Sequence, residues 1–396
     1  MLYFLLHQVQ LNIDPNHLKI QIKTKEDDDN IFLSKSLLKY LNITKHNISQ
    51  CGNDWDTYKK YTNPYEFIHT TIPYMNYSIS KYKPISRAFF KLVEIYNVFN
   101  IPNKFEHNIK TFHLAEGPGG FIEATAKLRN NPYDKYYGMT LLNKKDNSIP
   151  GWKKSEKFLK THKNVILEYG ASNDGDMYNE INYKYCIDKY KNSMNIITGD
   201  GGFDFSIDFN SQEMSAIKLI FIQTAYAIAL QKYNGTFILK IYDMFLKSTV
   251  DIIFLLSIFY KNVYITKPKT SRYANSEKYI VCTAFKYKDT DFILKKLYNI
   301  IKVFNNIDLN VYKIDSILSI PINLYIKNQL EEINAIFGQQ QIENISNTIK
   351  LIYNNDKKKD KIENIKGQNI NKCINWCIQN DIEHNKNTQY SNVFLN

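Results

Sequence analysis

Cysteine is scarce in this 396-residue chain: it occurs five times, an odd number, at scattered positions. This usage argues against a disulfide-stapled scaffold and favours a reducing, intracellular compartment. No apolar run reaches the length of a membrane span, and the most apolar one, residues 252–260, is flanked by charge and predicts a buried helix. The first residues lack both a basic leader and a full apolar region, which argues against a secretory signal. We therefore expect no membrane partner.

Metal ligands are also sparse. Cys373 and Cys377 stand one helical turn apart with His384 nearby, and three possible ligands without a fourth favour ordinary helix packing over zinc. We expect no metal. Acidic residues are outnumbered, because 51 Lys and Arg against 39 Asp and Glu give a net charge of +12, and 30 tyrosines accompany them. Many basic proteins bind nothing anionic, but this balance favours a nucleic acid over other partners.

Glycine is uncommon, with 14 residues, yet three of them fall with a proline in the run Gly117-Pro118-Gly119-Gly120. Apolar alternation through Phe112 and Leu114 predicts a buried strand that ends at Glu116, and a helical period begins at Phe121. A strand, a bare turn and a helix in this order form the first half of a nucleotide-binding α/β unit. The spacing is not Gly-x-Gly-x-x-Gly, so a dinucleotide is not the expected ligand. A purely structural turn is the alternative.

Two later strands carry ionisable residues. Residues 194–199 predict a short buried strand that ends at Asp200 between glycines, where the acid is either catalytic or a turn former. Residues 235–243 predict an apolar strand that Lys240 interrupts. A lysine there is costly unless its ammonium group reaches a partner or a cleft.

An amphipathic helix is predicted over residues 84–99, with Ser86 as a candidate cap. Lys91 lies outside the apolar stripe of this helix. For an isolated helix, this position predicts a solvent-exposed lysine. The strand over 136–142 ends in Gly-Met-Thr-Leu, without the acid that often binds a ribose, and Thr140 offers only a hydroxyl. After the next strand, the acids around Asp176 either bind a cofactor or cap the following helix.

Four stretches resemble the FtsJ-like RNA ribose 2′-O-methyltransferases. Leu-Ala-Glu-Gly-Pro-Gly-Gly-Phe at 114–121 is similar to their S-adenosylmethionine loop. Ser-Arg-Ala-Phe-Phe-Lys-Leu at 86–92, Asp-Gly-Gly-Phe at 200–203 and Lys-Pro-x-x-Ser-Arg-x-x-Asn-Ser-Glu-Lys-Tyr-x-Val at 267–281 resemble other family blocks. The resemblance covers about residues 84–286. Glu116 and the Met-Thr-Leu ending resemble the cap-specific members, above all those of large DNA viruses.

The resemblance implies an α/β fold with a Rossmann-like methyltransferase sheet of seven mostly parallel strands, the last antiparallel. It implies a catalytic tetrad of Lys91, Asp200, Lys240 and Glu277. Lys240 takes the role of general base, with a pKa lowered by positive surroundings and partial burial. S-adenosylmethionine is the implied cofactor, and its expected contacts are Glu116, Gly117, Pro118, Gly119, Gly120, Phe121, Thr140, Asp176 and Asp200.

We therefore predict methylation of the ribose 2′-hydroxyl of the first transcribed nucleotide of capped mRNA. The alternatives are a ribosomal or transfer RNA 2′-O-methyltransferase, or an inactive RNA-binding subunit of a capping complex. Lys267, Lys269 and Arg272 form a basic loop that we expect to bind RNA, and other capping or transcription proteins are expected partners. If the protein is viral, host cytoplasm and the virion are its expected locations. We expect an accessory region over 1–83, the methyltransferase domain over 84–290, and a helical region over 291–396. In that last region we predict helices over 292–304, 322–337 and 342–353.

Overall fold

The computed structural model describes residues 1–25, 31–143, 149–202, 211–353 and 358–386. Within these ranges eight strands form one large sheet in the order β1-β8-β9-β7-β6-β3-β4-β5. Their bounds are β1 Leu2–Leu5, β3 Lys110–Leu114, β4 Lys135–Met139, β5 Val165–Glu168, β6 Met194–Gly199, β7 Gln231–Ile241, β8 Tyr260–Lys267 and β9 Lys278–Phe285. Neighbouring strands from β5 to β7 pair in parallel, whereas β9 runs antiparallel to both β7 and β8.

The predicted Rossmann-like sheet with its antiparallel last strand is thus confirmed, but it has one strand more than the predicted seven. The extra strand is β1, which pairs antiparallel with β8 at the edge of the sheet. Its four residues are all apolar, and most of them are exposed. The sequence therefore lacks the alternation of apolar and polar residues by which a strand with one exposed face is predicted.

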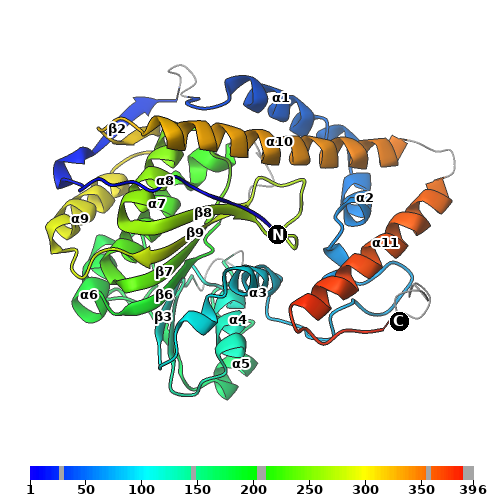
Figure 1. The fold of residues 1–396 in the computed structure, drawn as a ribbon, viewed down its shortest axis with the longest axis horizontal. Coiled ribbons are helices and arrows are strands. Elements are labelled where there is room, and N and C mark those ends of the chain that lie inside the picture. The colour runs from blue at the N-terminus through cyan, green and yellow to red at the C-terminus, as the bar shows by residue number, and fades with distance from the viewer. Residues whose placement is uncertain (26–30, 144–148, 203–210, 354–357, 387–396) are drawn as a thin grey trace.

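Successive residues of the central strands face two separate cores. Ile196 and Ile238 belong to a core with α3 and α4, whereas Ile197, Phe237 and Leu239 belong to a core with α6, α7, α8 and α9. Because helices cover both faces, these strands read as near-continuous apolar runs. Figure 1 shows α3, α4 and α5 on one side of the sheet and α6 to α9 on the other.

The helices that cover the two faces of the sheet are α3 Ala88–Phe99, α4 Gly120–Arg129, α5 Glu156–Thr161, α6 Glu180–Tyr190, α7 Gln212–Leu230, α8 Lys247–Phe259 and α9 Asp291–Asn305. The predicted stripe of α3 is buried, and Lys91 is buried as well, at 5% exposure, so the solvent-lysine interpretation is wrong. Ser86 does not cap α3, because the helix begins two residues later and the Ser86 hydroxyl has no hydrogen-bond partner among the described residues.

Helix α7 corrects the expectation that no segment is long enough to cross a membrane. This helix has 19 residues, and the mean hydropathy of its most apolar part is 1.3. By length and composition alone, it could therefore cross a membrane. However, 83% of that part is buried inside the protein. A core helix of this kind passes the same test, so the finding gives only weak support for a membrane segment.

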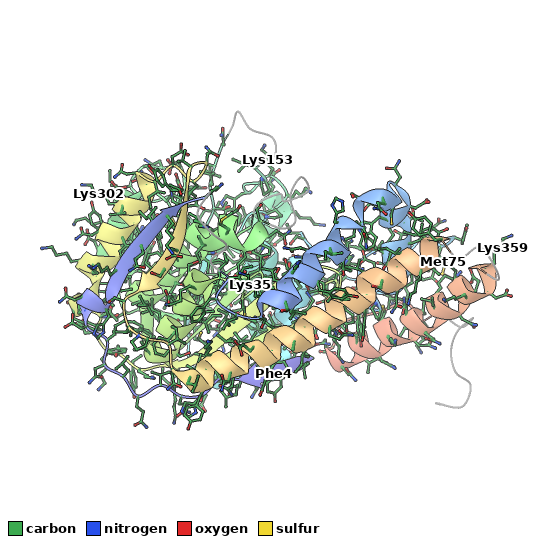
Figure 2. All side chains as sticks on the ribbon, turned by 90° about the horizontal axis from the view of Figure 1, so that it is seen from above. Phe4, Lys35, Met75, Lys153, Lys302 and Lys359 are labelled. Carbon is green, nitrogen blue, oxygen red and sulfur yellow. The ribbon has the colours of Figure 1, made fainter. Side chains whose placement is uncertain are left out.

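The amino-terminal and carboxyl-terminal regions pack on each other rather than standing apart. A second sheet pairs β2 Leu18–Thr24 with β10 Tyr312–Leu318. Figure 2 shows α1 Lys35–His46 lying along the long helix α10 Leu324–Tyr353, with α11 Lys358–Gln379 beyond it; α2 Asp54–Thr62 contacts both long helices. The C-terminal region is therefore not wholly helical.

Within that region, α9 confirms the first predicted helix, while the second and third form one continuous helix, α10. The intervening glutamines do not break the helix: Gln341 is buried and donates a hydrogen bond to the Ala274 carbonyl. Cys373 and Cys377 lie in the core on α11.

Candidate active site

Four ionisable side chains meet at the carboxyl edge of the parallel strands. Lys91 comes from the first turn of α3, and Asp200 follows β6. Lys240 lies near the end of β7, and Glu277 immediately precedes β9. Because β9 runs antiparallel to β7, the start of β9 reaches the edge where β6 and β7 end. The structure thus brings all four residues of the predicted tetrad together.

The tetrad consists of two ion pairs. Lys91 Nζ lies 2.7 Å from Glu277 Oε1 and 2.8 Å from Oε2. Lys240 Nζ lies 3.3 Å from Asp200 Oδ1 and donates a 2.7 Å hydrogen bond to the backbone carbonyl of Asp200. The four side chains are exposed by no more than 16%. Burial of this degree weakens solvent screening, so each charge acts strongly on the others.

The pKa of Lys240 differs from the sequence-based expectation. Burial alone would lower it, but Asp200, Tyr242 and Glu277 together raise it above the ordinary value of a lysine. The predicted lowering is therefore wrong for this arrangement, because the nearby carboxylates, Asp200 above all, outweigh the effect of burial. Burial alone would also raise the pKa of Glu277, yet Lys91 and Lys240 hold it well below its usual range. At neutral pH Glu277 is ionised and Lys240 carries a proton.

Two hydroxyl groups that sequence reasoning missed orient the carboxylates. Tyr279 Oη donates a 2.9 Å hydrogen bond to Asp200 Oδ1, and Ser271 Oγ donates a 2.8 Å bond to Glu277 Oε1. Tyr279 stands directly opposite Lys240 across β7 and β9. The available signal was its strand position: a residue paired with Lys240 projects to the same face of the sheet.

The glycine loop connects β3 to α4 as predicted. Glu116 Oε1 accepts hydrogen bonds of 2.8 Å from the amides of Phe121 and Ile122, so this carboxyl caps the helix. Gly119 has φ of +117°, a conformation that side chains rarely adopt. The loop therefore presents bare backbone at the carboxyl end of a central strand, where ligands of open α/β sheets bind.

Thr140 and the segment after residue 148 pack against this loop. A Cβ atom on Gly117 would lie 2.8 Å from Thr140 Oγ1 and 2.9 Å from the Gly151 carbonyl, so only glycine fits there. Ser155 Oγ donates a hydrogen bond to the carbonyl of Pro118. Gly151 and Ser155 had no motif to reveal them, since they lie far along the chain from the loop that they support.

Asp176 lies beside the end of β4. The amide of Leu142 donates a 2.7 Å hydrogen bond to the Asp174 carbonyl, which joins the turn after β5 to the residues after Thr140. Asn179, and not an aspartate, caps α6, so the capping alternative for these acids is wrong. Burial raises the pKa of Asp176. Asp176 remains a predicted cofactor contact.

The side chains around the loop fit S-adenosylmethionine, which carries ribose hydroxyls and positive charge. Glu116 Oε2 is buried and accepts no hydrogen bond from the described residues. Burial raises the pKa of this carboxyl well above its ordinary value, so a cationic ligand group would complete its environment. Thr140, Asp176 and the bare loop through Gly120 supply the remaining polar surface. These residues would hold the cofactor between the glycine loop and the tetrad.

A second group of buried charges lies beside the tetrad. The Asp243 carboxylate, just after β7, lies 3.3 Å from Lys45 Nζ of α1 and 3.0 Å from Lys278 Nζ. Lys278 also donates to the Ser276 carbonyl, on the other side of Glu277. Burial alone would raise the pKa of Asp243, but both lysines lower it. This group ties α1, β7 and the Glu277 segment into one unit.

In the structure, two of the three residues predicted to bind RNA have partners within the protein. Lys267 is buried, and its Nζ donates to Asn275 and to the Glu277 carbonyl, so it holds the tetrad segment rather than a phosphate. Arg272 forms an ion pair with the buried Glu66. Lys269 is partly exposed, with its Nζ 5.7 Å from the Tyr65 ring, and stays a prediction.

Comparison with known proteins agrees with this geometry. A family model described as FtsJ-like methyltransferase matches residues 84–285. The African swine fever virus protein named "Probable methyltransferase EP424R" is 29% identical over 301 residues, which are 68% of this chain and 66% of that protein. Two proteins named cap-specific mRNA (nucleoside-2′-O-)-methyltransferase 1 are also similar. That of Drosophila melanogaster is 30% identical over 45% of this chain, and that of Danio rerio is 27% identical over 74%.

This chain spans less than two thirds of these relatives: 66% of the viral protein, and 22% and 35% of the two animal proteins. A solved structure from Plasmodium falciparum, described as "a ribosomal RNA methyltransferase, putative", superposes with a TM-score of 0.36 at 22% identity, covering 50% of this chain and 97% of that chain. The assignment rests on the sequence match rather than on that superposition. Because the family model matches just over half of the residues, this chain belongs to the FtsJ-like methyltransferase family.

Proposed function

We propose that this protein transfers a methyl group from S-adenosylmethionine to the 2′-hydroxyl of the first transcribed nucleotide of capped mRNA. The observation that carries the proposal is the assembled tetrad, with the Lys91–Glu277 and Lys240–Asp200 pairs buried beside the glycine loop. An inactive RNA-binding subunit has no need of a lysine inside an apolar strand. The resemblance to cap-specific relatives supports capped mRNA as the substrate class.

The cofactor, when bound, supplies a methyl group that is already activated for displacement. The protein must then align the ribose hydroxyl and remove its proton. Lys240 is the proton acceptor, and the proton passes from the 2′-oxygen to Lys240 Nζ as the oxygen gains its methyl group. Asp200 orients Lys240, while Lys91, held by both Glu277 oxygens, positions the hydroxyl through its positive charge.

The protonation state of Lys240 sets a condition on this role. Its pKa is raised among the carboxylates, and only the neutral amine accepts a proton. The pKa falls when a further positive charge is placed at the same edge. A cationic cofactor at this edge would favour the neutral amine, but the two carboxylates oppose that shift, so Lys240 must release its proton before it accepts the one from the 2′-hydroxyl.

A methyl-transfer assay on three matched RNAs tests the proposal. The RNAs are capped, uncapped, and capped with a 2′-O-methyl group already on the first nucleotide. We expect transfer to the first, much slower transfer to the second, and none to the first nucleotide of the third. Equal rates on capped and uncapped RNA would favour a ribosomal or transfer RNA substrate, and no transfer at all would favour an inactive subunit.

A further inference from the structure

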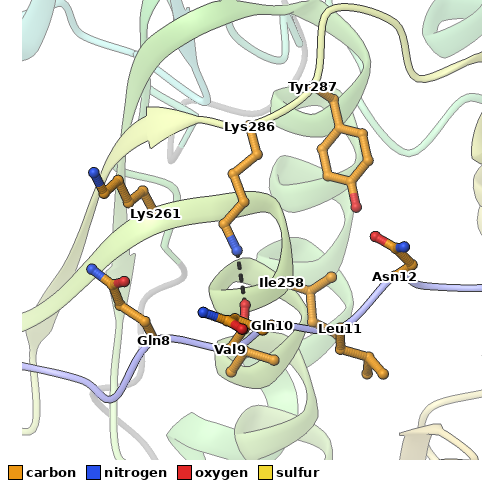
Figure 3. Close-up of a pocket in the computed structure, with 9 residues that line it drawn as sticks. All are labelled: Gln8, Val9, Gln10, Leu11, Asn12, Ile258, Lys261, Lys286 and Tyr287. Atoms are coloured by element: carbon orange, nitrogen blue, oxygen red, sulfur yellow. Dashed lines mark hydrogen bonds between the residues drawn. The ribbon is translucent and has the colours of Figure 1, made fainter.

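Two hollows lie at the amino edge of the sheet, opposite the tetrad. The first, of about 480 Å³, is lined by Lys261 at the start of β8 and by Lys286 just after β9 (Figure 3). The second, of about 530 Å³, is lined by Lys104 and by residues at the starts of β6 and β7. Both lie at this edge because β9 ends where the parallel strands begin.

A hydrogen bond connects the two hollows. Gln8 Nε2 donates to Asn262 Oδ1 at 3.3 Å; Gln8 lines the first hollow and Asn262 lines the second. The hollows thus flank the first residues of β8, and their polar linings meet there. We call the two hollows together the amino-edge groove.

The charge of the amino-edge groove is of one sign. Among the described residues that line it there are three lysines and no carboxylate. Burial lowers the pKa of Lys104 and of Lys286, and no neighbouring carboxylate raises either one back. Two further hollows elsewhere in the described part of the molecule are different, because Asp315 lines both and Glu213 and Asp243 line one. The amino-edge groove therefore favours anions.

Lys286 has a partly structural role, since its Nζ donates to the carbonyls of Val9 and Ser257, the first of which Figure 3 marks. Lys104 and Lys261 donate no side-chain hydrogen bond within the part of the chain that the structure describes. Their ammonium groups are thus available to a ligand.

The remaining lining suits nucleotides better than acidic peptide. Six amide side chains line the groove. Gln8, Asn195 and Asn262 already form hydrogen bonds within the protein. The other three, Gln10, Asn12 and Asn234, line the hollows as well and can donate to and accept from a nucleotide. Three aromatic rings, Phe105, Tyr233 and Tyr287, are also present, and Tyr233 is 53% exposed. Aromatic rings beside cations are the usual means of binding single strands without sequence preference.

Two aromatic rings, the partly buried Tyr264 on β8 and Tyr3 on the neighbouring β1, lie between the groove and the edge that carries the tetrad. Asn262 and Tyr264 project from the same face of β8, and the Tyr3 ring lies 5.9 Å from the Tyr264 ring. Tyr3 is 49% exposed. Strand β8 has eight residues and spans about 26 Å, so only an RNA of several nucleotides contacts both edges of the sheet.

We propose that the amino-edge groove binds the sugar–phosphate chain of single-stranded RNA, several nucleotides away from the methylated ribose. This rests on the proposed function for the identity of the polymer. The groove would strengthen binding of long transcripts without contacting the reacting atoms.

The test compares the affinities of two labelled single-stranded RNAs, of about 4 and about 16 nucleotides, the range of site sizes in single-strand-binding folds. The variant Lys104→Glu/Lys261→Glu should lose about tenfold in affinity for the long RNA and little for the short one. A plot of log K against log salt should become shallower, its slope decreasing in magnitude by about 1.4, because two phosphate contacts are lost. Lys135→Glu, at the same edge on β4 and outside both hollows, is the matched control and should bind like the unchanged protein.

Three outcomes would overturn the proposal. The double variant binds the long RNA as tightly as the unchanged protein, Lys135→Glu weakens binding as much, or oligoglutamate competes as well as RNA does. Methyl transfer to the short capped RNA separates this test from the proposed function. If the unchanged protein transfers no methyl group to the short capped RNA, the proposed function is contradicted. If transfer is normal but the double variant binds the long RNA as tightly as the unchanged protein, only the amino-edge groove is contradicted.

Discussion

The Lys240 ammonium group donates a 2.7 Å hydrogen bond to the backbone carbonyl of Asp200 and lies 3.3 Å from its carboxylate. Two acceptors on one residue fix the position of Lys240 Nζ. They also stabilise its protonated form, so the raised pKa and the precise placement have the same cause. A lysine held in this way is oriented for proton transfer but must lose its proton first.

Substitution of Lys240 by methionine keeps most of the side-chain volume and removes the ionisable group. We expect the single-turnover rate to fall by about two to four orders of magnitude, the contribution of a positioned base. Affinity for cofactor and RNA should change little, because the lost interaction acts in the transition state. Since the pKa of Lys240 is raised, the rate of the unchanged protein should rise with pH without a plateau at neutral pH, and the variant should lose this rise.

Lys232→Met is the matched control, since Lys232 is an exposed lysine of the same strand. It should retain the rate and pH profile of the unchanged protein. A Lys240→Met rate above about a tenth of normal is incompatible with a base. Water or Asp200 would then be the proton acceptor, with Lys240 acting only through its charge.

The regular elements of the core could be predicted from the sequence because their patterns are strong. The strands around Asp200 and Lys240 are apolar on both faces, and the glycine run separates two different periods. Strand β10 was missed because the sequence signal for it is short and its partner, β2, lies about 300 residues away. Pairing over such a separation leaves no local pattern.

The four residues of the tetrad could likewise be predicted from the sequence. The contacts that the neighbouring basic residues make could not. Lys267 and Arg272 read as an exposed basic loop because a sequence shows charge but not burial. Their partners, the Glu277 carbonyl and Glu66, are set by tertiary packing. In the sequence, Tyr279 is one of the apolar residues of a buried strand. The hydrogen bond from its hydroxyl group to Asp200 could be found only from the structure.

A second prediction concerns the cofactor loop. Gly119→Val places a β-branched residue at φ of +117° and within 3.1 Å of Ser155 Oγ, so the loop must change shape. We expect calorimetry to show at least a tenfold loss of affinity for S-adenosylmethionine. Gly52→Val is the control, because Gly52 also has positive φ, at +51°, but has open space around it. Unchanged affinity in Gly119→Val would contradict the assignment of this loop.

A third prediction concerns the charges beside the tetrad. Lys45→Met removes one of the two cations that neutralise the buried Asp243 carboxylate. The free energy of unfolding should fall by about 1–3 kcal/mol, since a buried charge loses a partner. Urea unfolding measures the change, and Lys39→Met, an exposed lysine on the same helix, should have almost no effect. If the two variants unfold alike, Lys45 does not stabilise Asp243.

The last prediction follows from the Glu66–Arg272 ion pair. Burial alone would raise the pKa of Glu66, but the hydrogen bond and charge of Arg272 lower it from 4.5 to about 2. A carboxyl with a depressed pKa stabilises the fold above its unfolded-state pKa, and the stabilisation is lost as pH falls through the folded-state value. The pair should therefore contribute about 3 kcal/mol at neutral pH and lose it between about pH 4.5 and pH 2.

Glu66→Gln removes this titration. Its free energy of unfolding should be lower than that of the unchanged protein at neutral pH, and the two should converge toward about pH 2. Arg272→Glu should be more harmful, because it places a second carboxylate against a buried one. Weak RNA binding by that variant would then reflect lost folding, which circular dichroism on the same sample would reveal. A stable, folded Arg272→Glu protein with lost RNA affinity would instead restore Arg272 as an RNA contact.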